Sequence, residues 1–600
     1  MLLLRRTGSA PKQIQRVFPI VVIVIAGCVL AAPVLIYGIP FFSDDAVTHH
    51  AVWYVHFSEQ LWAGDLYPRW LMGMNDGLGS PVFFYYPPVP FFLTSLLRPF
   101  FHGDSHGWYQ LGLSASAALI ASGLCAYVWL KQMVDGNSAL AAAVLYMSTP
   151  YHLAGDLYIR GSLAEYWAFI WMPLILFFTH KIVKGHRMAV AGFAVSYALL
   201  VMTHLPTTLI FSPVPVCYAF YLASAGRKMK STGMILGAVT LGAGLSFIYL
   251  WPAMTTQHFV FLDRMSTGYF SYKNWLLFSQ FSLWRPEKLL VLLTIVDLGG
   301  IACCAFIIAR VNANEATARL NAFWLAVAGA GILMMTQLST PIWVVFSVLQ
   351  KIQFPWRFNI ILSLATTALL ALAISSLRET SSARPKIAVT IALLLIIGWI
   401  PATGWAVWQA YPFHNPDQQE VNYKTREIAE AREVPEYYPR WNRAMAEMDW
   451  EVSIDEAEWD SQLNKKFESL RQSVADSGGA SSKVRVVEGT GEVNIINWMP
   501  GEIRLRTDTS TGMRLYVSQF YYPGWIAQLA GESSGLNIQP SEPDGVISIF
   551  VPGGQHEVLL QLKQGAAEKV GQLVSLISIG VMLVYVVAHK ARLKSPLFPG

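Results

Sequence analysis

The stretch VFPIVVIVIAGCVLAAPVLIYGI, residues 17–39, decides the fold class of this chain. It is long enough to cross a bilayer, which takes about 20 apolar residues. Four basic residues, Arg5, Arg6, Lys12 and Arg16, precede it. Because the run is too long for the core of a signal peptide and no small-residue cleavage site follows it, we interpret it as a first membrane-spanning helix.

Runs of the same kind recur along the chain. Hydrophobic residues make up 54% of the 600 positions and charged residues only 14%, which is too few for the surface of a soluble protein of this size. The sequence predicts an all-α polytopic membrane protein with about twelve transmembrane helices. We expect them at residues 17–39, 109–131, 138–153, 163–180, 188–203, 206–225, 232–253, 289–309, 320–338, 357–377, 387–408 and 570–588.

Charge predicts how these helices are oriented. With the N-terminus inside, the inner loops hold 19 Lys and Arg residues and the short outer loops hold 9. This asymmetry is typical of cytoplasmic loops and predicts that both termini are cytoplasmic. Residues 411–566 carry a net charge of −9 and the rest of the chain +14. We interpret the basic excess as a topology signal, and we expect no nucleic-acid partner.

The pattern divides the chain into three parts. The first is a multi-helix membrane domain with a long first outer loop. The second is an extracytoplasmic α+β domain with a helical part and a β-rich part, and the third is a last helix with a cytoplasmic tail. Short alternating runs separated by glycine-rich turns predict a small β-sandwich in the β-rich part. The bounds are 1–408 (loop 40–108), 409–566 (helical 415–475, β-rich 483–563) and 567–600.

The most conspicuous polar cluster is SDDAVTHH, residues 43–50, directly after the first helix. Asp44 and Asp45 are adjacent, and His49 lies four residues after Asp45, which places the two on one face if the segment is helical. Two carboxylates at a membrane surface suit a general base or a metal ligand. The alternative is a helix cap followed by a solvated turn. We treat all three residues as candidate catalytic groups. Any metal would be held by Asp44 and Asp45.

Further candidates for substrate binding lie in the other outer segments. In the first outer loop, aromatic and acidic side chains suit either the membrane interface or a wall for a sugar. In later loops, Arg160 and Arg357 suit phosphate oxygens. An ion pair with Glu165 explains Arg160 equally well, and snorkelling explains Arg357. His204 is more often a helix cap than a catalyst at such a position. The candidates are Asp65, Arg69, Asp76, Tyr85, Tyr86, Arg160, Glu165, His204 and Arg357.

Taken in order, these motifs resemble a known family. They are the acidic pair, GDLYPRW at 64–70, GLGSPVFFYYPP at 77–88, YIRGSLAE at 158–165, QFPWRF at 353–358 and YYPGW at 521–525. The chain resembles the bacterial membrane proteins labelled 6-pyruvoyl-tetrahydropterin synthase-related, which are similar to YfhO-type proteins. That family is similar in layout to the C-type (GT-C) glycosyltransferases.

The resemblance implies a membrane glycosyltransferase of the bacterial cytoplasmic (inner) membrane. It would move a sugar from a polyprenyl-phosphate donor to an envelope glycan, lipid or protein acceptor on the outer face. Asp44 or Asp45 would be the catalytic carboxylate, and Arg160 and Arg357 would hold the leaving lipid phosphate. Many enzymes of that superfamily carry Asp-Glu at the first position. The Asp-Asp of this chain leaves open which carboxylate acts and whether a divalent cation is bound.

A second hypothesis keeps the fold without the reaction. In it, the chain is a non-catalytic membrane protein that binds or flips a glycolipid, and its carboxylates are structural or ion-coupling groups. A third possibility, a secondary transporter, is disfavoured because we expect no charged residue in the middle of a helix and no inverted repeat.

Overall fold

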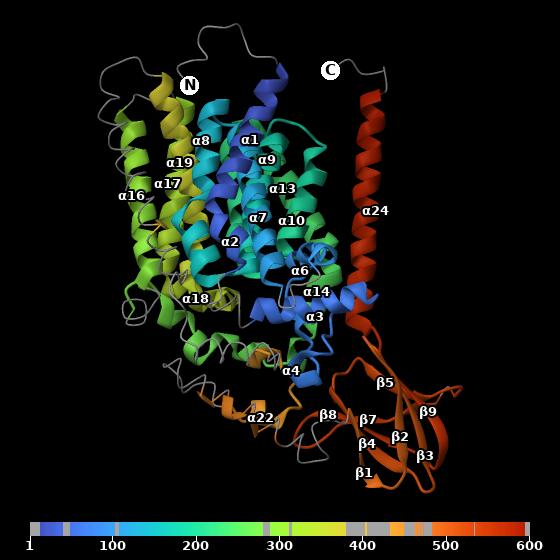
Figure 1. Cartoon of the computed structure of the whole chain (residues 1–600). Helices are drawn as coiled ribbons and strands as arrows, with labels where there is room; N and C mark the ends of the chain where they lie inside the picture. The colour runs from blue at the N-terminus through green and yellow to red at the C-terminus, as the bar shows by residue number, and fades with distance from the viewer. Residues whose placement is uncertain are drawn as a thin grey trace.

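The computed structural model is a bundle of helices with a group of strands beyond one end (Figure 1). It describes residues 12–39, 49–101, 107–279, 288–310, 315–379, 403–404, 433–448, parts of 461–472, 483–532 and 534–594, and the statements below concern these residues.

The helices of the bundle coincide with the apolar runs of the sequence. Their bounds are α1 (Lys12–Leu30), α2 (Ala32–Tyr37), α7 (Trp108–Leu130), α8 (Gly136–Met147), α9 (Leu163–Val183), α10 (Ala189–Val201), α11 (Leu205–Phe211), α12 (Pro213–Leu222), α13 (Lys228–Leu245), α14 (Phe247–Thr255), α16 (Lys288–Arg310), α17 (Glu315–Met335), α19 (Asn359–Glu379) and α24 (Ala566–Lys594).

Among the described residues, seven helices are long and apolar enough to cross a membrane, or eight if the bent pair α13–α14 is one span. Three further predicted spans, 17–39, 138–153 and 188–203, form shorter or interrupted helices, namely α1–α2, α8 and α10. The predicted span 387–408 lies almost entirely outside the described residues. The chain is therefore a mostly helical multi-span membrane protein, and the total of twelve spans stays a prediction.

One predicted span, 232–253, is broken. Helices α13 and α14 meet at an angle of 76°. The break frees backbone groups that water cannot reach inside a membrane. Ser575 of α24 satisfies them, because its hydroxyl donates to the Leu245 carbonyl at 3.0 Å and accepts from the Ile248 N–H at 2.8 Å. Helix α24 is thereby held beside the break, although only 11% of its apolar window is buried.

The first outer loop is built from short helices: α3 (Ala51–Trp62), α4 (Met74–Gly77), α5 (Val82–Tyr85), α6 (Val89–Ser95) and η3 (Arg98–Phe100). The apolar spacing at 48–62 predicts a helix on the membrane surface. The helix forms, but protein covers most of its sides, because Trp53 and Phe57 pack against Phe83 and Phe91. The loop is thus a packed layer with its own aromatic core.

Short helical turns fill the remaining outer connections. They are η4 (Tyr151–Arg160), η6 (Gln257–Phe259), η7 (Leu262–Ser266), η8 (Gly268–Phe270), η9 (Tyr272–Trp275), η10 (Gln337–Ser339), α18 (Thr340–Val345), η11 (Ser347–Ile352), η12 (Pro355–Phe358), η13 (Pro435–Tyr437) and α22 (Arg443–Ala446), with η5 (Ala225–Arg227) at the opposite end. The predicted helical segment 415–475 lies mostly outside the described residues.

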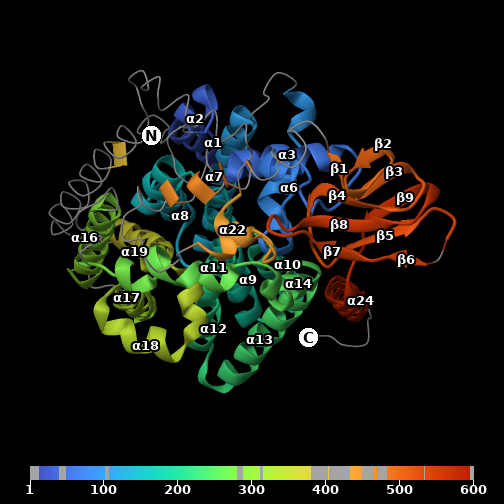
Figure 2. The same cartoon turned by 90° about the horizontal axis from the view of Figure 1, so that it is seen from below.

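The predicted β-rich part forms two antiparallel sheets, in the orders β1-β4-β8-β7 and β2-β3-β9-β5-β6. Buried side chains alternate along β3 and β4 and belong to the same core cluster, as expected for sheets that face one another. Figure 2 shows the strands beside α3 and above the end of α24. The strands are β1 (Val484–Gly489), β2 (Glu492–Met499), β3 (Glu502–Thr509), β4 (Met513–Phe520), β5 (Trp525–Leu529), β6 (Gly535–Leu536), β7 (Ile538–Pro540), β8 (Val546–Val551) and β9 (Gly554–Leu562).

Candidate functional site

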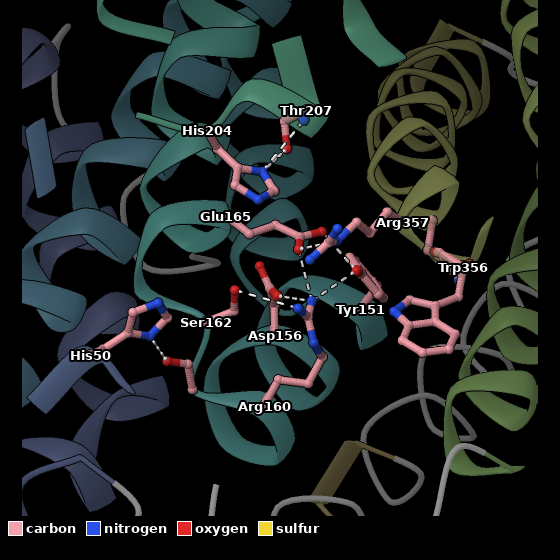
Figure 3. Close-up of polar contacts among 12 residues, drawn as sticks. His50, Tyr151, Asp156, Arg160, Ser162, Glu165, His204, Thr207, Trp356 and Arg357 are labelled. Atoms are coloured by element: carbon pink, nitrogen blue, oxygen red, sulfur yellow. Dashed lines mark hydrogen bonds and ion pairs between the residues drawn. The ribbon is translucent and has the colours of Figure 1, made fainter. Parts of the chain in front are cut away.

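A charged cluster lies where η4, α9 and η12 meet (Figure 3). Arg160 donates from one guanidinium nitrogen to Asp156 Oδ1 at 2.9 Å and to Glu165 Oε2 at 2.8 Å. Arg357 places Nε 3.3 Å from the same Glu165 oxygen. Tyr151 donates its hydroxyl to Glu165 Oε1 at 2.8 Å. Two arginines therefore share one buried carboxylate, and Asp156 balances the second positive charge.

Local sequence explains how Arg160 and Glu165 meet. Residues 151–160 form a π-helix, and Gly161 ends it with a φ of 61°, a conformation that glycine adopts at little cost. Helix α9 begins two residues later, so Glu165 lies in its first turn, where a carboxylate faces the positive helix end. The predicted pairing of Arg160 with Glu165 is present in the structure.

The cluster also contains hydrogen-bond donors that the protein itself does not use. Among the described residues, Arg357 Nε and Trp356 Nε1 are buried with no hydrogen-bond acceptor. Arg357 Nε forms an ion pair with the Glu165 oxygen, but its N–H is not directed at that oxygen. Arg357 donates from another nitrogen to the Ile352 carbonyl at 2.7 Å, which fixes the side chain. Figure 3 shows the Trp356 indole beside Tyr151 and below Arg357. Unsatisfied buried donors are rare, and they suit a ligand whose polar atoms are all hydrogen-bond acceptors.

Two histidines flank the cluster. His204 caps α11, because its Nδ1 accepts from the Thr207 N–H at 3.4 Å and lies 2.7 Å from the Thr207 hydroxyl. His50 contacts the Gly161 carbonyl through Nδ1 at 3.3 Å and the Tyr86 hydroxyl through Nε2 at 2.9 Å. An Nδ1–H that donates to the carbonyl leaves Nε2 to accept from the tyrosine. His50 thus joins the first outer loop to the turn that carries Arg160.

Beside His50 lies a group of aromatic side chains, which we call the aromatic wall: Trp53, Tyr85, Tyr86 and Tyr437. The rings of Trp53 and Tyr86 are 4.7 Å apart, and Tyr85 stacks on Tyr437 at 6.4 Å. The Tyr85 hydroxyl bonds to the Thr256 carbonyl at 2.9 Å, and burial raises the pKa of Tyr85 to about 12, so it is a neutral phenol. The candidate His49 is half-buried and stacks on Trp53 at 5.7 Å.

A buried carboxyl that the sequence analysis missed supports the wall from behind. Glu433 accepts from Trp53 Nε1 and is hydrogen-bonded to the Ser80 hydroxyl, while its own backbone N–H donates to the side chain of Asn75. Burial raises the pKa of Glu433 to about 8, and the hydrogen bonds only partly offset this. Glu433 stands 353 positions from Ser80 in an acidic stretch, so no local spacing in the sequence marks it.

The remaining predicted residues of the first outer loop lie apart from the charged cluster. Arg69 donates to the Ile248 carbonyl at 3.0 Å, at the break between α13 and α14, and stacks on Tyr67. Asp65 accepts from the Tyr67 N–H at 3.1 Å, and burial raises its pKa. Asp76 is exposed, in a turn with a φ of 57°. No contact described for these three reaches Arg160, Glu165 or Arg357.

Asp44 and Asp45 lie outside the described residues. They precede His49 by five and four positions, and His49 adjoins His50 at the edge of the charged cluster. Within the described residues, no group of three or more His, Cys, Asp or Glu side chains has the arrangement of a metal site.

Comparison with solved structures finds large glycan-transferring membrane enzymes. The arabinofuranosyltransferase AftD from mycobacteria aligns with a TM-score of 0.41 and 15% identity over 68% of this chain. The oligosaccharyltransferase AglB from Archaeoglobus fulgidus, solved with an inhibitory peptide and a dolichol-phosphate, aligns with a TM-score of 0.42 and 13% identity over 71%. The chain spans 27% of the length of AftD and 60% of the length of AglB. Similarities of this size assign no fold, no residue and no activity to this chain.

No curated protein sequence matches the chain. A family model described as a 6-pyruvoyl-tetrahydropterin synthase related domain of a membrane protein matches residues 83–410. The matched region includes the aromatic residues Tyr85 and Tyr86 and the whole cluster of Arg160, Glu165 and Arg357. Since it covers more than half of the sequence, the chain belongs to the 6-pyruvoyl-tetrahydropterin synthase related family of membrane proteins.

Proposed function

We propose that this chain is a membrane glycosyltransferase that moves a sugar from a polyprenyl phosphate to an acceptor hydroxyl on the outer face of a bacterial inner membrane. The acceptor is an envelope glycan, lipid or protein. The observation that carries the proposal is the pair of buried donors without acceptors, Arg357 Nε and Trp356 Nε1, at a cluster that also holds Arg160. A phosphate offers only acceptor oxygens, which matches these two donors.

The reaction needs few groups because the lipid phosphate is already a good leaving group. In the proposed step, the carboxylate of Asp44 or Asp45 takes the proton of the acceptor hydroxyl. The acceptor oxygen forms a bond to the anomeric carbon, and the bond from that carbon to the phosphate oxygen breaks. The phosphate keeps the electron pair, and the N–H groups of Arg357 and Trp356 stabilise its charge. The partly exposed ring of Tyr86, in the aromatic wall, covers the apolar face of the sugar. Whether a divalent cation assists is left open.

The proposed topology places this site outside the membrane. Helix α24 ends and α1 begins at the end of the bundle away from the strands (Figure 1). The basic residues at that end include Lys131, Arg187 and Arg378, which agrees with cytoplasmic termini. We further propose twelve spans in all: eleven within a membrane domain 1–408 and the twelfth in the last helix, at 567–600, which follows an extracytoplasmic domain 409–566.

The test is glycan transfer in a deletion strain complemented with the wild type, Asp44→Asn or Asp45→Asn. Mass spectrometry of envelope polysaccharides and lipids is the readout. We expect one Asn variant to reach wild-type levels in the membrane and to lose one specific sugar. If both variants restore every glycan that the wild type restores, the carboxylates are not catalytic and the proposal fails.

One observation favours the alternative, a non-catalytic protein that binds or flips a glycolipid. Asp297 lies in the middle of α16, is fully buried, and has no hydrogen-bond partner among the described residues. The expectation that no helix carries a charged residue at its centre is therefore wrong. Membrane-buried carboxyls of this kind occur in proton relays and transporters. The alternative predicts that Asp297→Asn fails to complement the deletion strain, whereas both Asn variants of the acidic pair complement it.

A further inference from the structure

The β region holds a pocket that the proposed reaction does not use. Its volume is about 370 Å³, within the range of roughly 300–1,000 Å³ typical of small-molecule sites. It lies at the edge strands β6 and β7, where the chain leaves one sheet and joins the other. The lining residues are Tyr521, Trp525, Ile526, Ala527, Gln528, Gly535, Leu536, Asn537 and Ile538.

The chemistry of the lining limits what the pocket can bind. None of these side chains is charged, so a phosphate, a nucleotide or an acidic sugar would meet no counter-charge. Tyr521 offers a partly exposed ring, which can cover the apolar face of a sugar. Gln528 is partly exposed and Asn537 is exposed. The amide of each both donates and accepts hydrogen bonds, as a pair of sugar hydroxyls requires.

A second observation at the same pocket points to a polar ligand. The Trp525 side chain is 3% exposed, and its indole N–H has no hydrogen-bond partner among the described residues. A buried donor without an acceptor costs about 1–3 kcal/mol. A ligand hydroxyl oxygen next to Trp525 would supply the missing acceptor.

The segment that lines the pocket also contacts the first outer loop. Trp525 meets Trp70 edge-on at 6.1 Å. Tyr522 bonds through its hydroxyl to the Tyr85 hydroxyl of the aromatic wall at 3.0 Å. In the YYPGW motif of residues 521–525, Tyr522 therefore contacts the aromatic wall, whereas Tyr521 and Trp525 line the pocket. The motif thus connects the pocket to the first outer loop.

We propose that this pocket binds one or two residues of a neutral glycan and so holds the acceptor beside the first outer loop. The identity of the bound glycan as the acceptor rests on the proposed glycosyl transfer. The binding of a neutral glycan to the pocket does not depend on that reaction. A peptide added to a sheet edge is the competing occupant. The edge strands β6 and β7 have only two and three residues, which offers too short a ladder for that mode.

The test is saturation-transfer NMR on the full-length chain in detergent micelles. The neutral probes are maltotriose, cellotriose, mannotriose and N-acetylchitotriose, together with neutral oligosaccharides released from the envelope of the source cells. Trigalacturonate and a threonine-rich octapeptide are the acidic and peptide probes. We expect a neutral probe to bind, and Gln528→Ala or Asn537→Ala to weaken it at least tenfold. Trp525→Phe, which removes the N–H together with the five-membered ring that carries it, should weaken it severalfold.

The matched control is Asn494→Ala, which removes an exposed amide on β2 at the opposite edge of the same sheet. It should bind as the wild type does. The inference is overturned if no neutral probe binds, if Asn537→Ala binds like Asn494→Ala, or if the octapeptide or trigalacturonate binds the pocket equally well. Repeating the titration on whichever of Asp44→Asn and Asp45→Asn abolishes transfer separates the two proposals, since that variant should leave trisaccharide binding intact.

Discussion

Trp356 carries one of the two donors on which the proposed lipid-phosphate site depends. Its indole N–H is buried without an acceptor among the described residues, whereas the N–H of Trp62 donates to the Ser95 carbonyl at 2.9 Å. Trp356→Phe removes an unsatisfied donor, which offsets part of the packing lost with the smaller ring, so we expect only a small change in stability. Trp62→Phe removes a donor that is in use, so the lost hydrogen bond should lower the melting temperature. An equal loss in both variants would mean that Trp356 already has a partner within the protein.

Glu433 predicts a pH dependence of stability. The unfolded chain releases this proton near the ordinary glutamate value of 4.5, whereas the folded protein keeps it until about pH 8. The unfolded state binds fewer protons in this window, so stability falls as pH rises. The pKa of the neighbouring Glu436 is raised by burial to about 7. Glu436 therefore adds to the same decline of stability.

The measurement is thermal unfolding of the detergent-solubilised chain at pH 5 to 9. We expect Glu433→Gln, which keeps an acceptor for Trp53, to flatten the decline between pH 5 and about pH 8. The slope removed should approach about 1.4 kcal/mol per pH unit, the free energy equivalent of one pKa unit. The exposed Glu532 provides the control variant Glu532→Gln. A decline of the same steepness in both variants contradicts the buried, neutral Glu433.

At the scale of elements, two glycines of α24 test how this helix is held. A Cβ added at Gly571 would lie 2.5 Å from the Phe247 carbonyl oxygen, at the break between α13 and α14. A Cβ added at Gly580 meets nothing within 4 Å. Gly571→Ala should therefore destabilise the protein or displace α24. Gly580→Ala should be neutral or stabilise the helix by up to about 1 kcal/mol. Equal melting temperatures for the two variants would show that α24 does not pack there.

The sequence predicts these elements unevenly, for physical reasons. Long apolar runs such as 109–131 and 163–180 become helices because the bilayer leaves the backbone no other partner. The bend within 232–253 was missed because the hydroxyl that satisfies it, Ser575, belongs to a helix more than 300 positions later. Arg160 and Glu165 could be paired from their spacing, whereas the contact of Glu165 with Arg357, which lies far along the chain, could not.

At the scale of the whole molecule, the β region is fastened to the first outer loop through Gln519. Its amide accepts from Trp70 Nε1 at 2.7 Å and donates to the carbonyls of Met72 and Gly77. We expect Gln519→Ala to raise hydrogen exchange in residues 70–80 severalfold, because these backbone groups lose their partners. Gln555→Ala, which loses a bond to the exposed Asp508, should leave that segment unchanged. Unaltered exchange in Gln519→Ala would contradict a fastened β region.

The central claim is that the charged cluster binds the phosphate of a polyprenyl phosphate. Native mass spectrometry of the purified chain with equal amounts of a polyprenyl phosphate and the matching polyprenol tests it directly. We predict that the wild type retains the phosphate at least tenfold over the alcohol, that Trp356→Phe narrows this preference, and that Arg357→Gln removes it. Wild-type protein that retains both lipids equally, or Arg357→Gln protein that keeps the preference, would contradict the account.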